Sequence, residues 1–294
     1  MSLTLKSKNR IYGLIFIVIL LLLFYRLTRD DDSAWMDVSP RIAVLPLEGE
    51  IMSSRKWINT LNDFARDSRV AGILIPINSP GGQVAPSQEM YHAIKNIRDE
   101  SNIPIYVSMG SVAASGGYYA ALGADSVFAN AGTLTGSIGV IMQFPNYREL
   151  MEKIGVGMNV VKSQAFKDAG SPFREMTDLE RQYYQDLIDD VYQQFAEVVS
   201  LERGIDEINL TTLANGRVFT GRQAQAVGLI DAVGTFQDVH KLLCEQLGIP
   251  VSRDLLYPPQ SKRSLWRTIR DDMSSALPGW ESGGTIQLQY RIPY

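Results

Sequence analysis

The sequence has few of the residues that metal sites, disulfides and histidine-dependent active sites need. Its 294 residues include one cysteine and two histidines. One cysteine cannot form an intramolecular disulfide, and three such residues are too few for an ordinary zinc site. A Ser-His-Asp triad would have to take His92 or His240 from an ordinary helical face, away from any glycine-rich turn. We therefore expect no metal, no cofactor and a catalytic base other than histidine.

Basic residues are scarce after the first 29 positions. Those 29 hold five Lys or Arg and no Asp or Glu, which leaves 23 basic and 32 acidic residues and a formal net charge of −9 for the rest. An acidic surface repels phosphate backbones. The composition therefore argues against nucleic acid as a partner.

Long uncharged runs are also few, and the one at residues 11–25 follows Lys6, Lys8 and Arg10. Fifteen residues span about 22 Å as a helix, and flanking side chains can extend that reach by snorkelling. A cleaved signal peptide is the alternative, but no small-residue cleavage site follows. We expect an uncleaved transmembrane signal anchor in the inner membrane, with the N-terminus in the cytoplasm and the body on the periplasmic side.

The body alternates strand-like and helix-like segments. Apolar runs of strand length cover residues 42–47, 70–77, 103–107, 126–129 and 156–161, and helical spacing covers residues 57–64, 89–97 and 118–122. Such alternation predicts βαβ crossovers around a parallel sheet. The expected fold class is therefore α/β.

Two capping boxes mark longer helices, over residues 177–204 and 235–248. Cys244 falls within the second and is expected to be a buried, small apolar residue. The whole chain then divides into a cytoplasmic stub with the anchor, a linker, a body and a tail, over residues 1–29, 30–41, 42–248 and 249–294.

The tail differs in composition from the body. Within it Leu265, Ile269, Met273 and Leu277 recur every four residues, as on one face of a helix. That helix could pack on the body or a neighbouring subunit, or lie on a membrane surface. The sequence leaves these possibilities open.

Ser115 lies in a run of small residues between the strand at 103–107 and the helix at 118–122. A strand-to-helix turn would expose its hydroxyl, as a nucleophile requires. The alternative is a small residue that permits close packing of strand and helix.

A second glycine-rich turn, Asn-Ser-Pro-Gly-Gly at residues 78–82, also lies between a strand and a helix. Backbone N–H groups near a helix N-terminus favour a bound anion. We expect the N–H groups of Gly82 and Gly116 to bind the oxyanion of a tetrahedral intermediate. The alternative is a turn that only reverses the chain.

A lysine is the remaining candidate for the base. A lysine accepts a proton near neutral pH only where burial or positive charge lowers its pKa. The residues around Lys162 and Lys167 do not separate these two candidates. Ser137 could orient a neutral lysine through a hydrogen bond, or it could be an ordinary turn hydroxyl.

The order of these motifs resembles the short form of signal peptide peptidase A, in serine peptidase family S49, over roughly residues 42–247. The motifs are SPGG at 79–82, SVAASGGYY at 111–119, TGSIGV at 135–140, FKDAGSP at 166–172, GRVFTG at 216–221 and GLID at 228–231. The resemblance implies that Ser115 is the nucleophile and Lys167 the general base. It also implies that Gly82 is the oxyanion glycine and that Ser137 orients the lysine.

The resemblance further implies a ClpP/crotonase-like fold of repeated ββα units. The implied activity is that of a serine endopeptidase that degrades cleaved signal peptides and other apolar peptides at the membrane. Long members of the family carry two units in tandem, with the serine and the lysine in different halves, whereas this chain has one unit. We therefore expect a homo-oligomeric ring whose dyads form between subunits, with substrate bound by strand addition in an apolar groove.

Three other functions share some of these features. A membrane protease that processes a stomatin-like partner uses the same residue types on this fold. Acyl-CoA chemistry uses the same backbone donors, although the motif loops contain no acidic pair. A non-catalytic scaffold at the membrane surface is the alternative outside enzymes.

Overall fold

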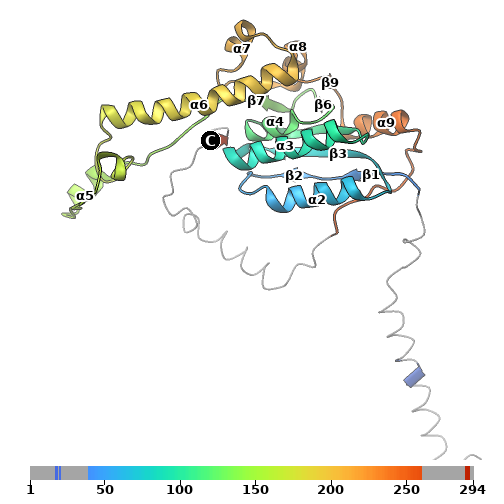
Figure 1. Cartoon of the computed structure of the whole chain (residues 1–294), viewed down its shortest axis with the longest axis horizontal. Helices are drawn as coiled ribbons and strands as arrows, with labels where there is room; N and C mark the ends of the chain where they lie inside the picture. The colour runs from blue at the N-terminus through green and yellow to red at the C-terminus, as the bar shows by residue number, and fades with distance from the viewer. Residues whose placement is uncertain (1–16, 19, 21–38, 260–288, 292–294) are drawn as a thin grey trace, which may run out of the picture. The chain divides into compact units, whose positions relative to one another are not determined.

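The computed structural model describes residues 17–18, 20, 39–259 and 289–291 (Figure 1). The chain divides into two units, residues 1–39 and 40–294. Most of the expected anchor, and the whole expected tail helix at 265–277, lie outside the described residues. Within the described ranges, no helix has both the length and the apolar character needed to cross a membrane.

An eight-stranded sheet forms the centre of the second unit. Its main path runs β1 (Arg41–Val44), β3 (Val70–Ser79), β5 (Ile105–Ala114), β6 (Ser126–Ala129) and β9 (Ala232–Val233), while β2 (Leu47–Glu48) pairs with β3, and β7 (Leu134–Gly136) pairs with β5 and β8 (Val218–Thr220). Every pair is parallel except β7 with β8. The predicted α/β class, with a mostly parallel sheet, is confirmed.

Helices bury both faces of this sheet. Successive residues of β1 face opposite sides of the sheet. Ala43 belongs to the core cluster that includes residues of α2 (Arg55–Arg66) and α3 (Val84–Glu100). Its neighbour Ile42 belongs to the cluster formed with α9 (Phe236–Leu247). Figure 1 shows α2 and α3 running across the sheet. Burial on both faces explains why these strands read as continuous apolar runs.

The capping boxes mark the helices that they predict. Thr177 opens α6 (Asp178–Arg203), and Gly204 ends it in the left-handed conformation with φ 63°. α9 ends at Gly248, and Cys244 within it is buried as expected.

α3 begins at Val84, five residues before the predicted start. The additional first turn contains Pro86. A proline is tolerated there because the first N–H groups of a helix have no partner within it.

The strand predicted at residues 156–161 is wrong. No strand forms there, and every residue of the segment is exposed; Val161 is completely so. The apolar pattern is present, but none of the described strands pairs with it. The segment belongs to the connecting arm, which we define as residues 142–177 and which contains α5 (Arg148–Lys153) and the 3-10 turn η2 (Ala165–Asp168).

Shorter elements complete the described chain. α4 (Gly116–Ala121) follows β5 directly, while α7 (Glu207–Leu213) follows α6 and α8 (Gly221–Ala226) follows β8. β4 (Gly81–Gln83) forms a separate two-stranded antiparallel sheet with β10 (Gln289–Arg291). This last pairing brings a piece of the tail to the glycine turn singled out in the sequence.

Candidate functional site

Ser115 joins β5 to α4 in a conformation that only glycine adopts easily. Its φ is 53° and its ψ −117°. The backbone is held on both sides, since Ser115 N–H donates to Gly136 O at 2.7 Å and Tyr119 N–H donates to Ser115 O at 2.8 Å. Such strain persists only where the surrounding structure enforces it, and it concentrates at functional sites.

The Ser115 hydroxyl is fully buried, whereas the sequence predicts an exposed one. Its Oγ has no hydrogen-bond partner within the part of the chain that the structure describes. A buried, unpartnered hydroxyl costs free energy. The side chain is therefore poorly explained by packing alone.

Ser137 shares the unusual backbone of Ser115. Among the described residues these two serines are the non-glycine residues with positive φ, and Ser137 has φ 51°. They follow the paired ends of two parallel strands, because Ala114 of β5 lies opposite Gly136 of β7. The sheet therefore brings together two serines that are 22 positions apart in the sequence.

The two expected oxyanion donors lie close to each other. A Cβ atom built on Gly116 would stand 3.2 Å from Gly82 N and 2.4 Å from Ser87 Oγ. On one side of β4, Gly81 O accepts a hydrogen bond from Ile51 N–H, and Gln83 N–H donates to Ile51 O. Because N–H groups alternate in direction along a strand, the N–H of Gly82 points to the opposite side.

That opposite side of β4 carries β10, in which Tyr290 lies across from Gly82. The carbonyl oxygen of Tyr290 would be 2.0 Å from a Cβ atom on Gly81 and 3.2 Å from one on Gly116. An extended segment on this edge thus places a backbone carbonyl beside the glycines that adjoin Ser115. The sequence offered no motif that could reveal this contact.

The side chain of Tyr290 enters a fully buried aromatic pocket. Its ring stacks on Tyr119 of α4 at 5.3 Å and packs against Phe195 of α6 at 4.7 Å. Its hydroxyl donates to Val191 O at 3.1 Å. Burial raises the pKa of the Tyr290 phenol, which stays protonated and able to donate. The edge of β4 therefore accepts an extended chain together with a large apolar side chain.

The two candidate lysines have different surroundings. The Lys162 amine donates to Asp168 Oδ1 at 2.5 Å and to Ala165 O at 3.0 Å. Lys167, on η2, is exposed, and its amine has no hydrogen bond or ion pair with any described residue. Since Ser115 Oγ also has no partner, the serine and Lys167 do not meet within the described chain. The dyad remains a prediction.

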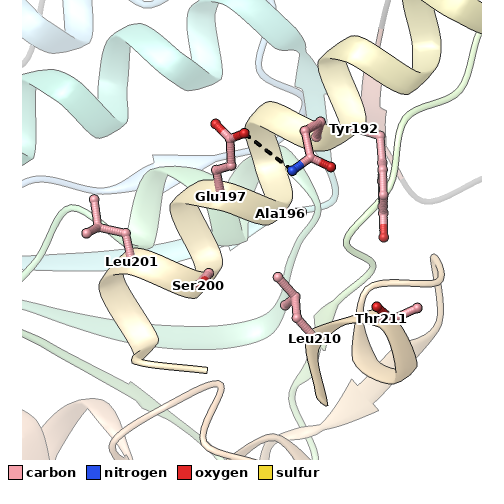
Figure 2. Close-up of a pocket in the computed structure, with 8 residues that line it drawn as sticks. Tyr192, Ala196, Glu197, Ser200, Leu201, Leu210 and Thr211 are labelled. Atoms are coloured by element: carbon pink, nitrogen blue, oxygen red, sulfur yellow. Dashed lines mark hydrogen bonds between the residues drawn. The ribbon is translucent and has the colours of Figure 1, made fainter. Parts of the chain in front are cut away.

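A cavity of about 460 Å³ lies elsewhere, between α6 and α7 (Figure 2). Its lining includes Tyr192, Leu201 and Leu210 but none of the candidate site residues. Ser200, its only serine, donates to Ile205 O at 2.8 Å and acts as a turn hydroxyl. No base adjoins a nucleophile there, so this cavity is not a candidate active site.

Comparison with known proteins identifies the family. The sequence model of Peptidase family S49 matches residues 97–249, and that of Clp protease matches residues 33–135. A candidate protease of Synechocystis sp. is 38% identical over 250 residues, which are 85% of each chain. A candidate signal peptide peptidase SppA of Enterococcus faecium is 38% identical over 189 residues, 64% of this chain and 55% of that one.

Two further matches have lower sequence identity. Protease 4 of Haemophilus influenzae is 31% identical over 211 residues, which are 69% of this chain and 34% of that protein. Among solved structures, a membrane-bound stomatin-specific protease superposes with a TM-score of 0.46 and 17% identity, over 76% of this chain and 99% of that one. A likeness at that level assigns neither fold nor substrate.

Proposed function

The chain belongs to peptidase family S49 and is a serine protease of that family, and we propose that it is a membrane-anchored endopeptidase with a Ser115-Lys167 dyad. The observation that carries the proposal is the strained, buried and unpartnered hydroxyl of Ser115. It adjoins Gly116, near which an extended segment already places the carbonyl oxygen of Tyr290.

The proposed reaction has two steps. Neutral Lys167 takes the proton from Ser115 as Oγ attacks the scissile carbonyl carbon, and the N–H groups of Gly82 and Gly116 stabilise the oxyanion. The protonated lysine then gives its proton to the leaving amine, and an acyl-enzyme forms. Water, deprotonated by the lysine, hydrolyses this ester and restores Ser115. Ser137 would orient the lysine amine.

The proposed substrates are apolar peptides, including signal peptides left in the membrane. The pairing of β10 with β4 supports recognition of an extended chain by strand addition, and the Tyr290 pocket supports a large apolar side chain on it. The name of the Enterococcus faecium relative, a signal peptide peptidase, is consistent with signal peptides as substrates. The uncharged segment at residues 11–25 would anchor the enzyme, with its catalytic body on the periplasmic side of the inner membrane.

The proposed assembly is a ring in which Lys167 of one subunit serves Ser115 of the next. Two observations support it: Lys167 is exposed on the connecting arm, and Ser115 Oγ lacks a partner among the described residues of its own chain. The arm and the start of α6 also expose large apolar side chains, namely Leu150, Ile154, Met158, Phe166 and Leu179. A neighbouring subunit would cover them.

Mixed particles test both the dyad and the ring. Ser115→Ala and Lys167→Ala should each lower kcat on an apolar fluorogenic peptide by about a thousandfold or more. When the two inactive chains are co-expressed in equal amounts, about a quarter of the sites should combine a native serine with a native lysine from another subunit. Activity should return to about a quarter of the wild-type value.

Lys162→Ala provides the control, because the Lys162 amine is already hydrogen-bonded to Asp168. It should keep most of the activity. Full activity of Lys167→Ala would overturn the dyad. Absence of activity in mixed particles, despite two inactive parents that assemble normally, would overturn the inter-subunit site alone.

A further inference from the structure

The turn that carries Lys167 has little support of its own. It is a 3-10 turn of four residues, and the chain from 156 to 167 is exposed throughout. Its backbone bonds are Lys167 N–H to Gln164 O at 3.2 Å and Ala169 N–H to Phe166 O at 3.1 Å. A 3-10 turn this short has poor hydrogen-bond geometry. The direction of Lys167 must therefore be set by groups outside the turn.

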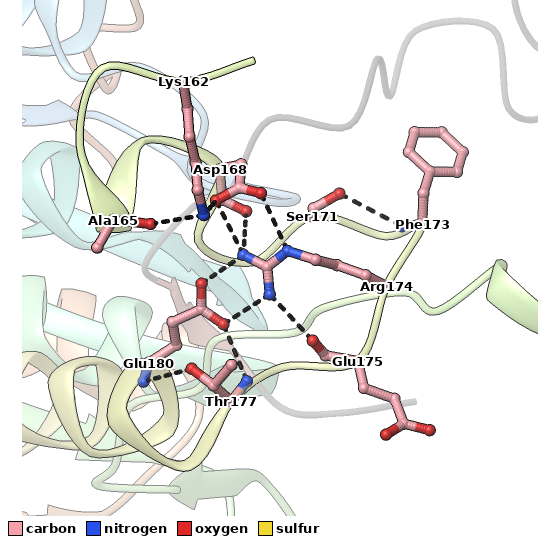
Figure 3. A network of polar contacts seen from close by, with 9 residues as sticks. All are labelled: Lys162, Ala165, Asp168, Ser171, Phe173, Arg174, Glu175, Thr177 and Glu180. Carbon is pink, nitrogen blue, oxygen red and sulfur yellow. Dashed lines mark hydrogen bonds and ion pairs between the residues drawn. The ribbon is translucent and has the colours of Figure 1, made fainter. Parts of the chain in front are cut away.

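Arg174 supplies the largest set of such contacts (Figure 3). Its Nε donates to Asp168 Oδ2 at 3.0 Å, and its Nη2 donates to Asp168 O at 2.9 Å. Its Nη1 donates to Glu180 Oε2 at 2.8 Å and to Glu175 O at 3.0 Å. One planar guanidinium thus ties the residue next to Lys167 to the first turn of α6.

Glu180 connects this guanidinium to the rigid part of the molecule. Its side chain accepts from Thr177 N–H at 2.9 Å, and Glu180 N–H donates to Thr177 Oγ1 at 3.3 Å. The same helix packs Phe195 and Val199 into the core. Because a continuous helix is stiff, the contacts lead from Asp168 through Arg174 and Glu180 to the core.

The three charged residues that join η2 to α6, namely Asp168, Arg174 and Glu180, form what we call the clasp. Lys162 lies outside it, because its amine bonds Asp168 and Ala165 O but no described residue of α6. Hydrogen bonds from Arg174 and then Lys162 lower the pKa of Asp168, and those from Arg174 lower the pKa of Glu180 to about 2. Lowered carboxyl pKa values mean that the clasp is intact above about pH 5 and weakens only as acid protonates these groups.

We propose that Arg174 is a positioning residue for Lys167, which holds the η2 turn against α6 so that the lysine amine reaches the serine of the adjoining subunit. The inference rests on the proposed dyad. Lysine would replace Arg174 only in part, because one ammonium group lacks the planar fork that bonds two carboxylates at once. A displacement of about 1 Å at a reacting group can cost a hundredfold in rate.

The test measures kcat and KM of the full-length variant Arg174→Gln on an apolar fluorogenic peptide. We expect kcat to fall by about tenfold or more, with KM within about twofold, because substrate binds on the serine side. The same amount of Ser115 should react with a fluorophosphonate probe, but more slowly. Arg174→Lys should give an intermediate kcat.

Arg148→Gln is the matched control. Arg148 lies on the same arm and forms ion pairs with Glu152 and Glu175 at 2.8 and 2.7 Å, but it has no ion pair with the residues of η2. We expect its kcat to equal that of the wild type. If Arg174→Gln also keeps wild-type kcat while Lys167→Ala is inactive, the positioning role is overturned. If Lys167→Ala is active, the dyad itself fails, whatever Arg174 does.

A second variant covers a failure of Arg174→Gln to fold. Glu180→Gln keeps an oxygen for Arg174 and for Thr177 but removes one charge from the clasp. It should lower kcat by about threefold with KM unchanged. A fall in melting temperature without any change in kcat, measured well below unfolding, would indicate a purely structural role and would overturn the inference.

Discussion

The serine side and the lysine side of the proposed site are built in opposite ways. Ser115, Gly82 and Gly116 lie inside the sheet and its first helices, where backbone atoms surround them. Lys167 lies on an exposed arm that ion pairs hold to α6. The strained serine and the proposed oxyanion donors therefore lie within one chain, whereas the proposed base depends on side-chain charges and on the proposed neighbour.

Glycine substitutions should separate the two regions most sharply. A Cβ atom on Gly82 would stand 2.3 Å from Ile51 O and 2.6 Å from Ile51 N, both backbone atoms that cannot move aside. Gly82→Ala should lower the free energy of unfolding by at least about 2 kcal/mol and abolish activity. Gly157→Ala on the arm meets no atom within 4 Å and should change neither quantity.

Chemical denaturation and peptide cleavage measure this difference. Equal stability of the two variants would show that β4 is not packed as tightly as its contacts indicate. An effect confined to Gly157→Ala would reverse the comparison.

The tail offers a test of intermediate size, because β10 occupies the edge of β4 that a substrate strand would use. A chain that ends at residue 288 should bind substrate more readily, and we expect KM to fall by about three- to tenfold with little change in kcat. Tyr290→Ala should give part of this effect, since it removes the side chain packed on Tyr119 and Phe195. An unchanged KM in both variants, at a temperature where they remain folded, would mean that substrate binds elsewhere.

The smallest expected effect concerns the strain at the two serines. Ser115→Gly and Ser137→Gly should each raise the free energy of unfolding by about 1 kcal/mol, because glycine adopts positive φ without a clash. Only Ser115→Gly should abolish cleavage completely. Thermal unfolding of both variants checks the first point, and a loss of stability at Ser115 would show that its conformation is not strained.

Part of the site could be predicted because its signals are local. The small residues around Ser115 require close packing, and the capping boxes act within four positions of the chain. Lys162 and Lys167 could not be separated in this way, since each follows an apolar residue and precedes a polar one. What distinguishes them is that Asp168 binds Lys162, a contact that depends on how the arm folds back on Arg174.

The strand predicted at residues 156–161 does not form, for a related reason. Alternating Val156, Met158 and Val160 satisfy the pattern of a strand, but a strand forms only beside a partner with free backbone groups. No described strand reaches this part of the arm. The exposed side chains fit a surface that another subunit would cover.

By itself the sequence determined the α/β class, the positions of the two capped helices and the candidate residues, because hydrophobic periodicity and capping act over short distances along the chain. Only the tertiary structure decided that Ser115 and Ser137 stand side by side, that Tyr290 covers the glycine turn, and that Arg174 supports the turn bearing Lys167. These contacts join residues far apart in the chain or depend on the direction of single side chains. Strand register and packing set such contacts, and no local pattern of residues encodes them.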